Sequence, residues 1–340
     1  MDGRLGSVVE NFSRIHKVQN TLLRWFRVHQ RDLPWRHTKD PYKILVSEIM
    51  LQQTQVDRVM PKYRPFLRRF PTVQALARAT PRDVLLAWEG MGYNRRALYL
   101  LRAAQDIVQR FHGRVPTDPV LLRTLPGIGD YTAAAVATFS TGVPYALADV
   151  NVRRVMGRVF LGAHPVEQKL TQAIQDTTPH QAIAGFPPGM WGHAVMDFGA
   201  LVCKAKPRCE ACPLQQHCKA YPQLQLQDSH NRSPRANRGL SGPRFASTSS
   251  GRGESRRGNR SGSHPNIPDR IYRGKILQLI REHDPRPLSL RAVSAVLADI
   301  SAARLRRLVR GLENDGLLVA TGRTLHFANE GIPVRQPAGS

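Results

Sequence analysis

The sequence is poor in acidic residues and lacks long apolar runs. It has 25 Asp and Glu against 50 Lys and Arg, which gives a formal net charge of +25. Such an imbalance indicates a polyanionic partner, with nucleic acid favoured over an anionic membrane surface. No run of about 18 apolar residues occurs, which excludes a membrane-spanning helix, and the first twenty residues lack the apolar stretch of a signal peptide. We therefore expect a cytoplasmic, nucleoid-associated protein.

Cysteine is absent except in one short window. The four cysteines follow the pattern C-x5-C-x2-C-x5-C, at Cys203, Cys209, Cys212 and Cys218. A disulfide framework would join distant segments, so a metal site is the better interpretation. Four thiolates can enclose either a tetrahedral zinc ion or a four-iron cluster, and spacing alone does not choose between them. One tight pair flanked by wider loops favours iron–sulfur ligation.

The sequence up to about residue 221 also lacks alternating strand patterns. Its apolar residues recur at intervals of three and four, which predicts an all-α fold. From 223 to 267 the composition changes to Ser, Gly, Asn and Arg, and such a segment buries too little apolar surface to fold. We predict a disordered basic linker, which serves either as a weak phosphate-binding tether or simply as a solubilising spacer.

A small third unit follows the linker. The predicted helices span 271–283, 289–297 and 301–314, and the predicted strands span 317–319 and 325–327. Ser289 and Ser301 stand where helix N-caps belong. Three helices and a hairpin resemble a winged helix, an α+β arrangement. Its third helix exposes Arg304, Arg306, Arg307 and Arg310. Duplex binding and protein contact are both compatible with this pattern.

The segment 125–131, LPGIGDY, lies between two helical stretches and is typical of a helix-hairpin-helix turn. Gly127 and Gly129 let the backbone approach a ligand closely, and the next helix begins near Asp130 with free amide groups. Such amides bind a phosphate without reading bases.

Six motifs in order resemble the helix-hairpin-helix, endonuclease III-like DNA glycosylases. They are LPWR at 33–36, VSEIMLQQT at 46–54, GMGY at 90–93, LPGIGDY at 125–131, DVNVRR at 149–154 and the cysteine cluster. The LQQT run is most similar to the MutY family of adenine glycosylases, and the similarity covers about residues 25–222. The resemblance implies two helical domains that enclose a cleft and a [4Fe-4S] cluster held by the four cysteines.

The resemblance also implies the partner and the boundaries within residues 1–222, while composition and the helix pattern set those of the linker and of the last domain. Residues 1–30 and 150–222 would form the iron–sulfur domain, 31–149 a six-helix domain, 223–267 the linker and 268–334 the winged-helix-like domain. The expected substrate is double-stranded DNA in which adenine is mispaired with 8-oxoguanine or guanine, and the protein is expected to be a monomer.

Excision of a purine needs an acid at the base and an anion at the sugar. By resemblance Glu48 is the acid, and its apolar surroundings would raise its pKa and keep it protonated. Asp149 matches the carboxylate that stabilises the oxocarbenium ion. Asn151 can hold Asp149 or a water, and Tyr131 can donate to one of these oxygens. Members that also cut the strand carry a lysine at position 131, so we predict a monofunctional enzyme.

The base must leave the stack to be reached. By resemblance Gln53 and Tyr93 would fill the vacated space, with Met91 beside them, and Arg31, Trp35 and Arg36 would line the pocket for the flipped base. Core packing is the alternative for Trp35 and Tyr93. The predicted substrate-binding residues also include Thr54, Gly127, Gly129 and His193.

Three features depart from the family pattern. His193 stands where Gln or Glu is usual in the adenine pocket, the first cysteine spacing is five residues where six is more frequent, and 268–334 does not resemble the family's MutT-like domain. Two rival functions remain: a thymine or uracil mismatch glycosylase on the same scaffold, and a non-catalytic DNA-binding regulator. Glu48 and Asp149 together argue against the regulator, since a binder has no use for carboxylates that face phosphate.

Overall fold

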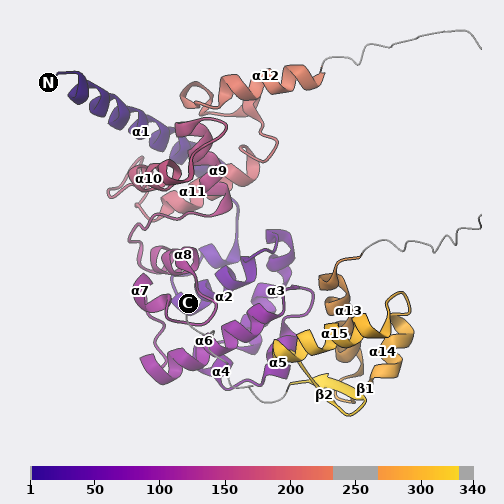
Figure 1. The fold of residues 1–340 in the computed structure, drawn as a ribbon. Coiled ribbons are helices and arrows are strands. Elements are labelled where there is room, and N and C mark those ends of the chain that lie inside the picture. The colour runs from indigo at the N-terminus through magenta and orange to yellow at the C-terminus, as the bar shows by residue number, and fades with distance from the viewer. Residues whose placement is uncertain (1, 233–266, 329–340) are drawn as a thin grey trace, which may run out of the picture.

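The computed structural model describes residues 2–232 and 267–328. Figure 1 shows three bodies: a discontinuous domain built from α1 and α9–α12, a central domain built from α2–α8, and a C-terminal domain that carries α13–α15 and the strands. The chain passes from the discontinuous domain into the central domain, back again, and then to the C-terminal domain.

The discontinuous domain joins segments far apart in the sequence. Its elements are α1 (Asp2–His29), α9 (Val150–Met156), the π-helical η2 (Gly157–Leu161), α10 (Glu167–Thr177), α11 (Met190–Leu201), the 3₁₀ turns η3 (Cys209–Ala211) and η4 (Gln215–His217), and α12 (Tyr221–Arg232). One apolar core contains Leu22 and Phe26 of α1 together with Val155 and Phe198. Burial of this shared core holds α1 against α9 and α11.

The central domain is contiguous. It contains η1 (Pro34–Arg36), α2 (Pro41–Leu51), α3 (Val56–Arg69), α4 (Val73–Ala77), α5 (Pro81–Ala87), α6 (Arg95–Phe111), α7 (Pro119–Leu122) and α8 (Asp130–Thr141). Helix α2 begins where Pro41 fixes the first turn and the Asp40 carboxylate accepts a hydrogen bond from the Tyr42 amide at 2.9 Å. Residues 44–50 are apolar on nearly every face, so α2 is buried all round.

The C-terminal domain contains α13 (Asp269–His283), β1 (Leu288–Ser289), α14 (Leu290–Val296), α15 (Ala302–Asn314), β2 (Leu318–Thr321) and β3 (Thr324–Phe327). The three strands form an antiparallel sheet in the order β1-β3-β2, with Leu318 opposite Phe327. Ser289 and Ser301 cap α14 and α15 by accepting hydrogen bonds from the amides of Ala292 and Arg304. The predicted helices, caps and hairpin are confirmed, and the two-residue β1 is an addition.

The predicted linker begins inside a helix. Helix α12 continues to Arg232, so residues 223–232 are helical. The remainder of the predicted linker, 233–266, and residues 329–334 of the predicted winged-helix-like domain lie outside the described residues. Within 2–232 and 267–328, no helix combines the length and the apolar character needed to cross a membrane.

The C-terminal domain packs directly on the central domain. Their buried apolar residues belong to one continuous core. Arg82 and Asp284 form a two-point ion pair across the junction, with Nε and Oδ1 2.8 Å apart. Arg281 donates to the Leu85 carbonyl at 3.2 Å and lies 3.6 Å from Glu89. These contacts fix the position of α13 relative to α5.

Candidate active site

Glu48 is a carboxyl group inside the central domain. It lies on α2, and the residue is only 6% exposed. Burial raises the pKa of Glu48 to about 7; the charge of Asp149 acts in the same direction, while a hydrogen bond from Tyr131 and the charge of Arg36 oppose the shift. Glu48 is therefore a proton donor near neutral pH, and Tyr131, Asp149 and Arg36 lie near enough to act on it.

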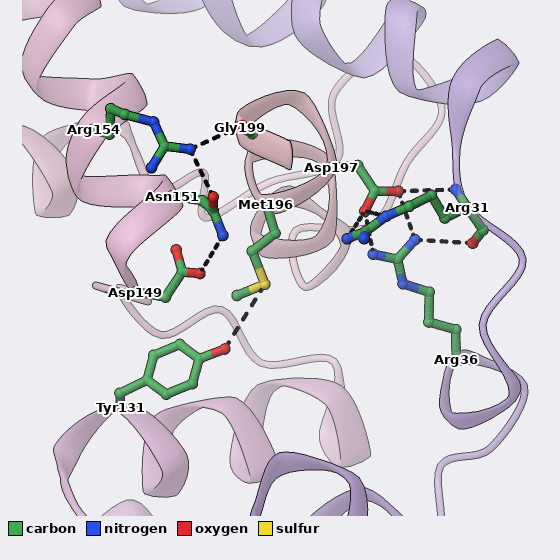
Figure 2. Close-up of polar contacts among 9 residues, drawn as sticks. All are labelled: Arg31, Arg36, Tyr131, Asp149, Asn151, Arg154, Met196, Asp197 and Gly199. Carbon is green, nitrogen blue, oxygen red and sulfur yellow. Dashed lines mark hydrogen bonds and ion pairs between the residues drawn. The ribbon is translucent and has the colours of Figure 1, made fainter. Parts of the chain in front are cut away.

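Asp149 is the N-cap of α9, on the discontinuous domain. Its Oδ1 accepts a hydrogen bond from the Val152 amide at 2.6 Å, and its Oδ2 accepts one from Asn151 Nδ2 at 3.0 Å. Figure 2 shows the Asp149 carboxylate pointing toward Asn151. Capping holds the carboxylate at the helix start, where the helix dipole favours the anion. The structure thus brings Glu48 and Asp149 to one site from two domains.

Arg154 extends this network toward the cysteines. Its Nη2 donates to Asn151 Oδ1 at 2.7 Å and to the Gly199 carbonyl at 2.9 Å, and its Nε donates to the Cys203 carbonyl at 2.7 Å. Figure 2 shows the line from Asp149 through Asn151 to Arg154. The orientation of Asp149 is therefore connected, through one guanidinium, to the start of the cysteine segment.

Tyr131 stands at the start of α8 beside both carboxyl groups. Its hydroxyl contacts the Met196 sulfur at 3.8 Å, in addition to its hydrogen bond with Glu48. Burial, reinforced by the neighbouring Glu48 and Asp149, raises the pKa of Tyr131 well above its usual value. The phenol is thus a hydrogen-bond donor in this site.

Arg31 and Arg36 converge on Asp197, which is completely buried in α11. Arg36 donates to both carboxylate oxygens at 2.7 Å, and Arg31 donates through its amide at 2.9 Å and through Nε at 2.7 Å. Burial works against ionisation of Asp197, but these hydrogen bonds and charges outweigh it and lower its pKa. The hydrogen bonds from Arg31 and Arg36 to Asp197 hold the segment that follows α1 against α11. Trp35, expected beside them in the base pocket, is a core side chain packed edge-to-face on Tyr63.

His193 lies on α11 and stacks on Phe139, with ring centroids 3.8 Å apart and planes 12° from parallel. Burial, followed by the charge of Arg36, lowers the pKa of His193 to about 3. The imidazole is therefore neutral at physiological pH, with one donor nitrogen and one acceptor nitrogen.

The two glycines of the 125–131 segment have different roles. Gly127 has φ +76°, and a Cβ there would lie 2.7 Å from the Cβ of Tyr99. A Cβ at Gly129 would meet nothing within 4 Å. Gly129 is also the N-cap of α8, so the first amides of the twelve-residue helix lie beside open space. This geometry agrees with the predicted helix-hairpin-helix turn.

Two loops, 52–54 and 91–93, meet around Arg96. Arg96 Nη1 donates to the carbonyls at the end of α2 and the start of the first loop, those of Ile49 (2.9 Å), Met50 (2.8 Å) and Gln52. Arg96 Nη2 donates to Thr54 Oγ1 (2.8 Å) and, in the second loop, to the carbonyls of Met91 (3.3 Å) and Gly92 (3.2 Å). The guanidinium also lies over the rings of Trp88 and Tyr93. One buried cation therefore sets the positions of both loops.

The tips of these loops are strained. Gln53 and Tyr93 have φ values of +54° and +45°, in the left-handed region that non-glycine residues seldom adopt. Both residues are exposed, and Tyr93 is 51% accessible. Met91, predicted beside them, is buried at 1% exposure, and Thr54 is tied to Arg96 below the surface.

The four cysteines lie around the two 3₁₀ turns η3 and η4. Burial raises the pKa of Cys212 to about 12, and the other three cysteines act in the same direction, so all four are neighbours. Arg158 Nη1 approaches the Cys203 sulfur at 3.6 Å, and the Cys218 thiol donates to the Arg158 carbonyl at 3.4 Å. In the described part of the chain, no three His, Cys, Asp or Glu side chains are grouped for a single metal ion. Four neighbouring thiolates form a donor set that can hold either a four-iron cluster or a zinc ion.

Three residues of the site escaped the sequence analysis: Asp197, Arg96 and Arg154. Asp197 carried a signal, because it is the only acid in an otherwise apolar helix, the feature that also marked Glu48. Nothing in the local pattern distinguishes Arg96 from its exposed neighbour Arg95, or Arg154 from Arg153. Their roles depend on carbonyl groups contributed by distant segments.

Comparison with known proteins gives consistent results. Residues 46–180 match the HhH-GPD superfamily of base excision DNA repair proteins. The chain is 43% identical over 202 residues to the adenine DNA glycosylase of Mycolicibacterium smegmatis, an alignment that covers 58% of this chain and 67% of the relative. It is 36% identical over 206 residues to that of Buchnera aphidicola subsp. Baizongia pistaciae, with 59% and 57% covered. The chain thus spans less than two thirds of the length of the Buchnera protein.

Among solved structures, a thermostable thymine-DNA glycosylase superposes with a TM-score of 0.57 at 30% identity, covering 63% of this chain and 99% of that one. A non-covalent endonuclease III–DNA complex superposes with a TM-score of 0.53 at 20% identity, covering 63% and 98%. The second likeness is one of fold alone.

Proposed function

Because the chain belongs to the HhH-GPD superfamily of base excision DNA repair proteins, we propose that it is a monofunctional DNA glycosylase that removes adenine mispaired with 8-oxoguanine or guanine. The observation that carries this proposal is the meeting of a protonated Glu48 with an Asp149 held in place by a helix N-terminus and by Asn151. A DNA-binding regulator would gain nothing from this pair.

The reaction follows from the two carboxyl groups. Glu48 gives its proton to a ring nitrogen of the extruded adenine, so that the glycosidic electron pair leaves with a neutral base. The sugar becomes an oxocarbenium ion, and the Asp149 carboxylate stabilises that positive charge. Water then adds to the sugar carbon, and its proton passes to a carboxylate. The products are free adenine and an abasic site.

Tyr131 determines the type of product. A lysine amine at this position would attack the sugar and lead to strand cleavage, but a phenol with a raised pKa does not act as such a nucleophile. Tyr131 instead donates a hydrogen bond to Glu48 and helps to orient it. Borohydride should therefore trap no protein–DNA adduct, and strand breaks should appear only after alkali.

The cysteines complete the proposal. Cys203, Cys209, Cys212 and Cys218 would hold a [4Fe-4S] cluster, which when bound fixes the shape of the basic segment 204–208. Absorbance near 400 nm with about four irons per chain is the expected result, and zinc in place of iron would contradict this part of the proposal.

One assay tests the function. The purified chain is incubated with duplexes that carry A opposite 8-oxoguanine, A opposite G, T opposite G or U opposite G, and abasic sites are then cleaved with alkali. We expect products from the two adenine duplexes. Glu48→Gln should lose the activity, whereas Glu167→Gln, which changes an exposed carboxylate in the same way, should keep it. Absence of products from every duplex would contradict the proposal.

A thymine mismatch glycosylase is the second candidate. The likeness to a thymine-DNA glycosylase over 99% of that chain favours it, and the neutral His193 imidazole offers hydrogen-bond groups that differ from those of Gln or Glu. Product from T opposite G alone would support this candidate over adenine excision.

A further inference from the structure

A cavity lies between the central and C-terminal domains. Its volume is about 710 Å³, and its walls come from the loops 52–53 and 91–94, from α3, α6 and α13, and from the end of α15. Glu48, Asp149, Tyr131 and His193 are not among its lining residues. The cavity, hereafter the interdomain cleft, is therefore separate from the proposed excision site.

The interdomain cleft is strongly basic. The residues of its lining that are charged at neutral pH are five arginines and one acid, Asp315. Asp315 binds Arg273 and lies 3.5 Å from Arg95 Nε, so this single carboxylate faces two guanidinium groups from two domains. Arg96 is occupied by the carbonyls beneath the loops. The local charge remains clearly positive after these pairings.

Two arginines of the lining remain available for a ligand. Arg58 on α3 and Arg270 on α13 are both exposed, and neither makes an ion pair with any residue in 2–232 or 267–328. Arg82, Asp284 and Arg281 connect the two domains that carry Arg58 and Arg270. A cleft with two guanidinium groups that no carboxylate neutralises is suited to a phosphodiester.

The same cleft contains Gln53 and Tyr93, the exposed and strained tips of their loops. By the family resemblance, these side chains would fill the space that the flipped base leaves and would touch the opposite base. The strand closest to them is then the strand that pairs with the target strand, while the target nucleotide turns toward Glu48.

We propose that the interdomain cleft binds a phosphodiester of the DNA strand opposite the excised base, with Arg58 on one side and Arg270 on the other. The C-terminal domain thereby becomes part of the surface that holds this strand. This inference rests on the proposed function for the identity of the strand, whereas the cleft and its charge do not depend on it.

The test uses the full chain and a duplex with a non-cleavable abasic analogue opposite guanine, with binding followed by fluorescence anisotropy at several salt concentrations. Arg270→Ala should weaken binding about three- to tenfold and make the slope of log K against log salt shallower by about one. Arg270→Glu should weaken binding further, and Arg270→Lys should retain most of it. Arg291→Glu is the matched control, because Arg291 is exposed on α14 and outside the cleft.

The strand is identified with methylphosphonate linkages, which remove the phosphate charge. Placed beside the unpaired guanine, they should weaken binding of the native chain as much as Arg270→Ala does and should weaken that variant no further. Placed in the target strand, their effect should add to that of the substitution. Additive losses on both strands, or equal losses for Arg270→Glu and Arg291→Glu, would overturn the proposal.

The outcome is separable from that of the proposed function. Binding is measured without excision. A chain that excises no base but shows the strand-specific effect would therefore support the proposed cleft and contradict the proposed function. A chain that excises adenine, but in which Arg270→Glu and the Arg291→Glu control bind the duplex equally well, would support the proposed function and contradict the proposed cleft. Unchanged thermal unfolding of Arg270→Lys and Arg270→Ala verifies that both variants fold.

Discussion

At the scale of single residues, burial and neighbouring charges together set the pKa of each carboxyl group in the site. Glu48 is buried beside another carboxyl group, and the result is a raised pKa. Asp197 is buried beside two guanidinium groups, and the result is a lowered pKa. The same carboxyl chemistry thus yields a proton donor at one position and, at the other, a carboxylate that is harder to protonate than usual.

The raised pKa of Glu48 predicts the pH dependence of the reaction. Single-turnover excision should be nearly constant below about pH 7, where Glu48 is protonated, and should fall about tenfold per pH unit above it. Glu48→Gln should lower the rate at least a hundredfold and abolish this dependence. Rapid quenching across pH 5–9 measures both. A native rate that rises with pH would contradict Glu48 as the acid.

Stability should respond in the same direction. The folded-state pKa of Glu48 lies above the unfolded value, so its contribution to stability is complete below pH 4.5 and is lost as the pH rises through about 7. Glu48→Gln avoids the buried charge and should raise the thermal midpoint relative to the native chain above pH 7. The exposed control Glu167→Gln should show no such pH-dependent gain.

At the scale of elements, arginine side chains hold loops through their carbonyl groups. Arg96 binds the carbonyls at the end of α2 and of the 91–92 loop, and Arg154 binds those of α11 and of the cysteine segment. Each guanidinium satisfies several acceptors that would otherwise be buried without partners.

Arg96→Met should therefore destabilise the fold. Several buried carbonyls would lose their donor, at a cost of roughly 3–5 kcal/mol in the free energy of unfolding. Arg96→Lys should recover part of this loss, since an ammonium offers three donors. Urea denaturation gives the comparison, with Arg102→Met on the same helix as control. A loss below about 1 kcal/mol would argue against Arg96 as the support of both loops.

Arg154 is a positioning residue for Asp149. Arg154→Met should reduce the single-turnover excision rate about ten- to hundredfold, as loss of such supporting contacts commonly does, while the Kd for a non-cleavable duplex changes less than about threefold. The adjacent Arg153→Met, which loses only an exposed ion pair with Glu167, should leave the rate unchanged. Equal effects on rate and Kd would assign Arg154 to DNA contact instead.

The elements themselves were largely predictable because their signals are local. Ser289 and Ser301 are N-caps whose side chains accept hydrogen bonds from amides three residues later, so each indicates the start of a helix locally. The turn at Gly322 separates two short strands. The start of the linker was misjudged because polar residues 223–232 continue a helix that Tyr221 begins. Asp197 and Arg96 could not be assigned roles, since their partners come from residues 31–36 and 49–54, far away in the sequence.

At the scale of the whole molecule, the C-terminal domain is held on the central domain by a shared apolar core and by a few polar contacts. The two carboxyl groups proposed for catalysis come from the central and discontinuous domains, whereas the interdomain cleft lies between the central and C-terminal domains. Small changes in docking would therefore affect DNA binding without touching a base-contacting residue.

The ion pair between Arg82 and Asp284 should make a measurable contribution to docking. Arg82→Ala, Asp284→Ala and the double variant form a thermodynamic cycle, for which we expect a coupling of about 1 kcal/mol, because the pair is two-pointed but partly exposed. The more exposed pair Arg123–Asp130 should give a value near zero. Coupling no larger than in this control would mean that apolar packing alone holds the C-terminal domain.

The discontinuous core has a consequence for biosynthesis. Residues 33–137 can collapse as soon as they leave the ribosome, whereas α1 emerges first and must wait for residues 152–214 before its apolar face is covered. During translation the apolar face of this amphipathic helix stays exposed, and chaperones bind exposed apolar surface of this kind. Closing the domain is then the late step that also brings Asp149 to Glu48, so the proposed active site is complete only after the cysteine segment has been made.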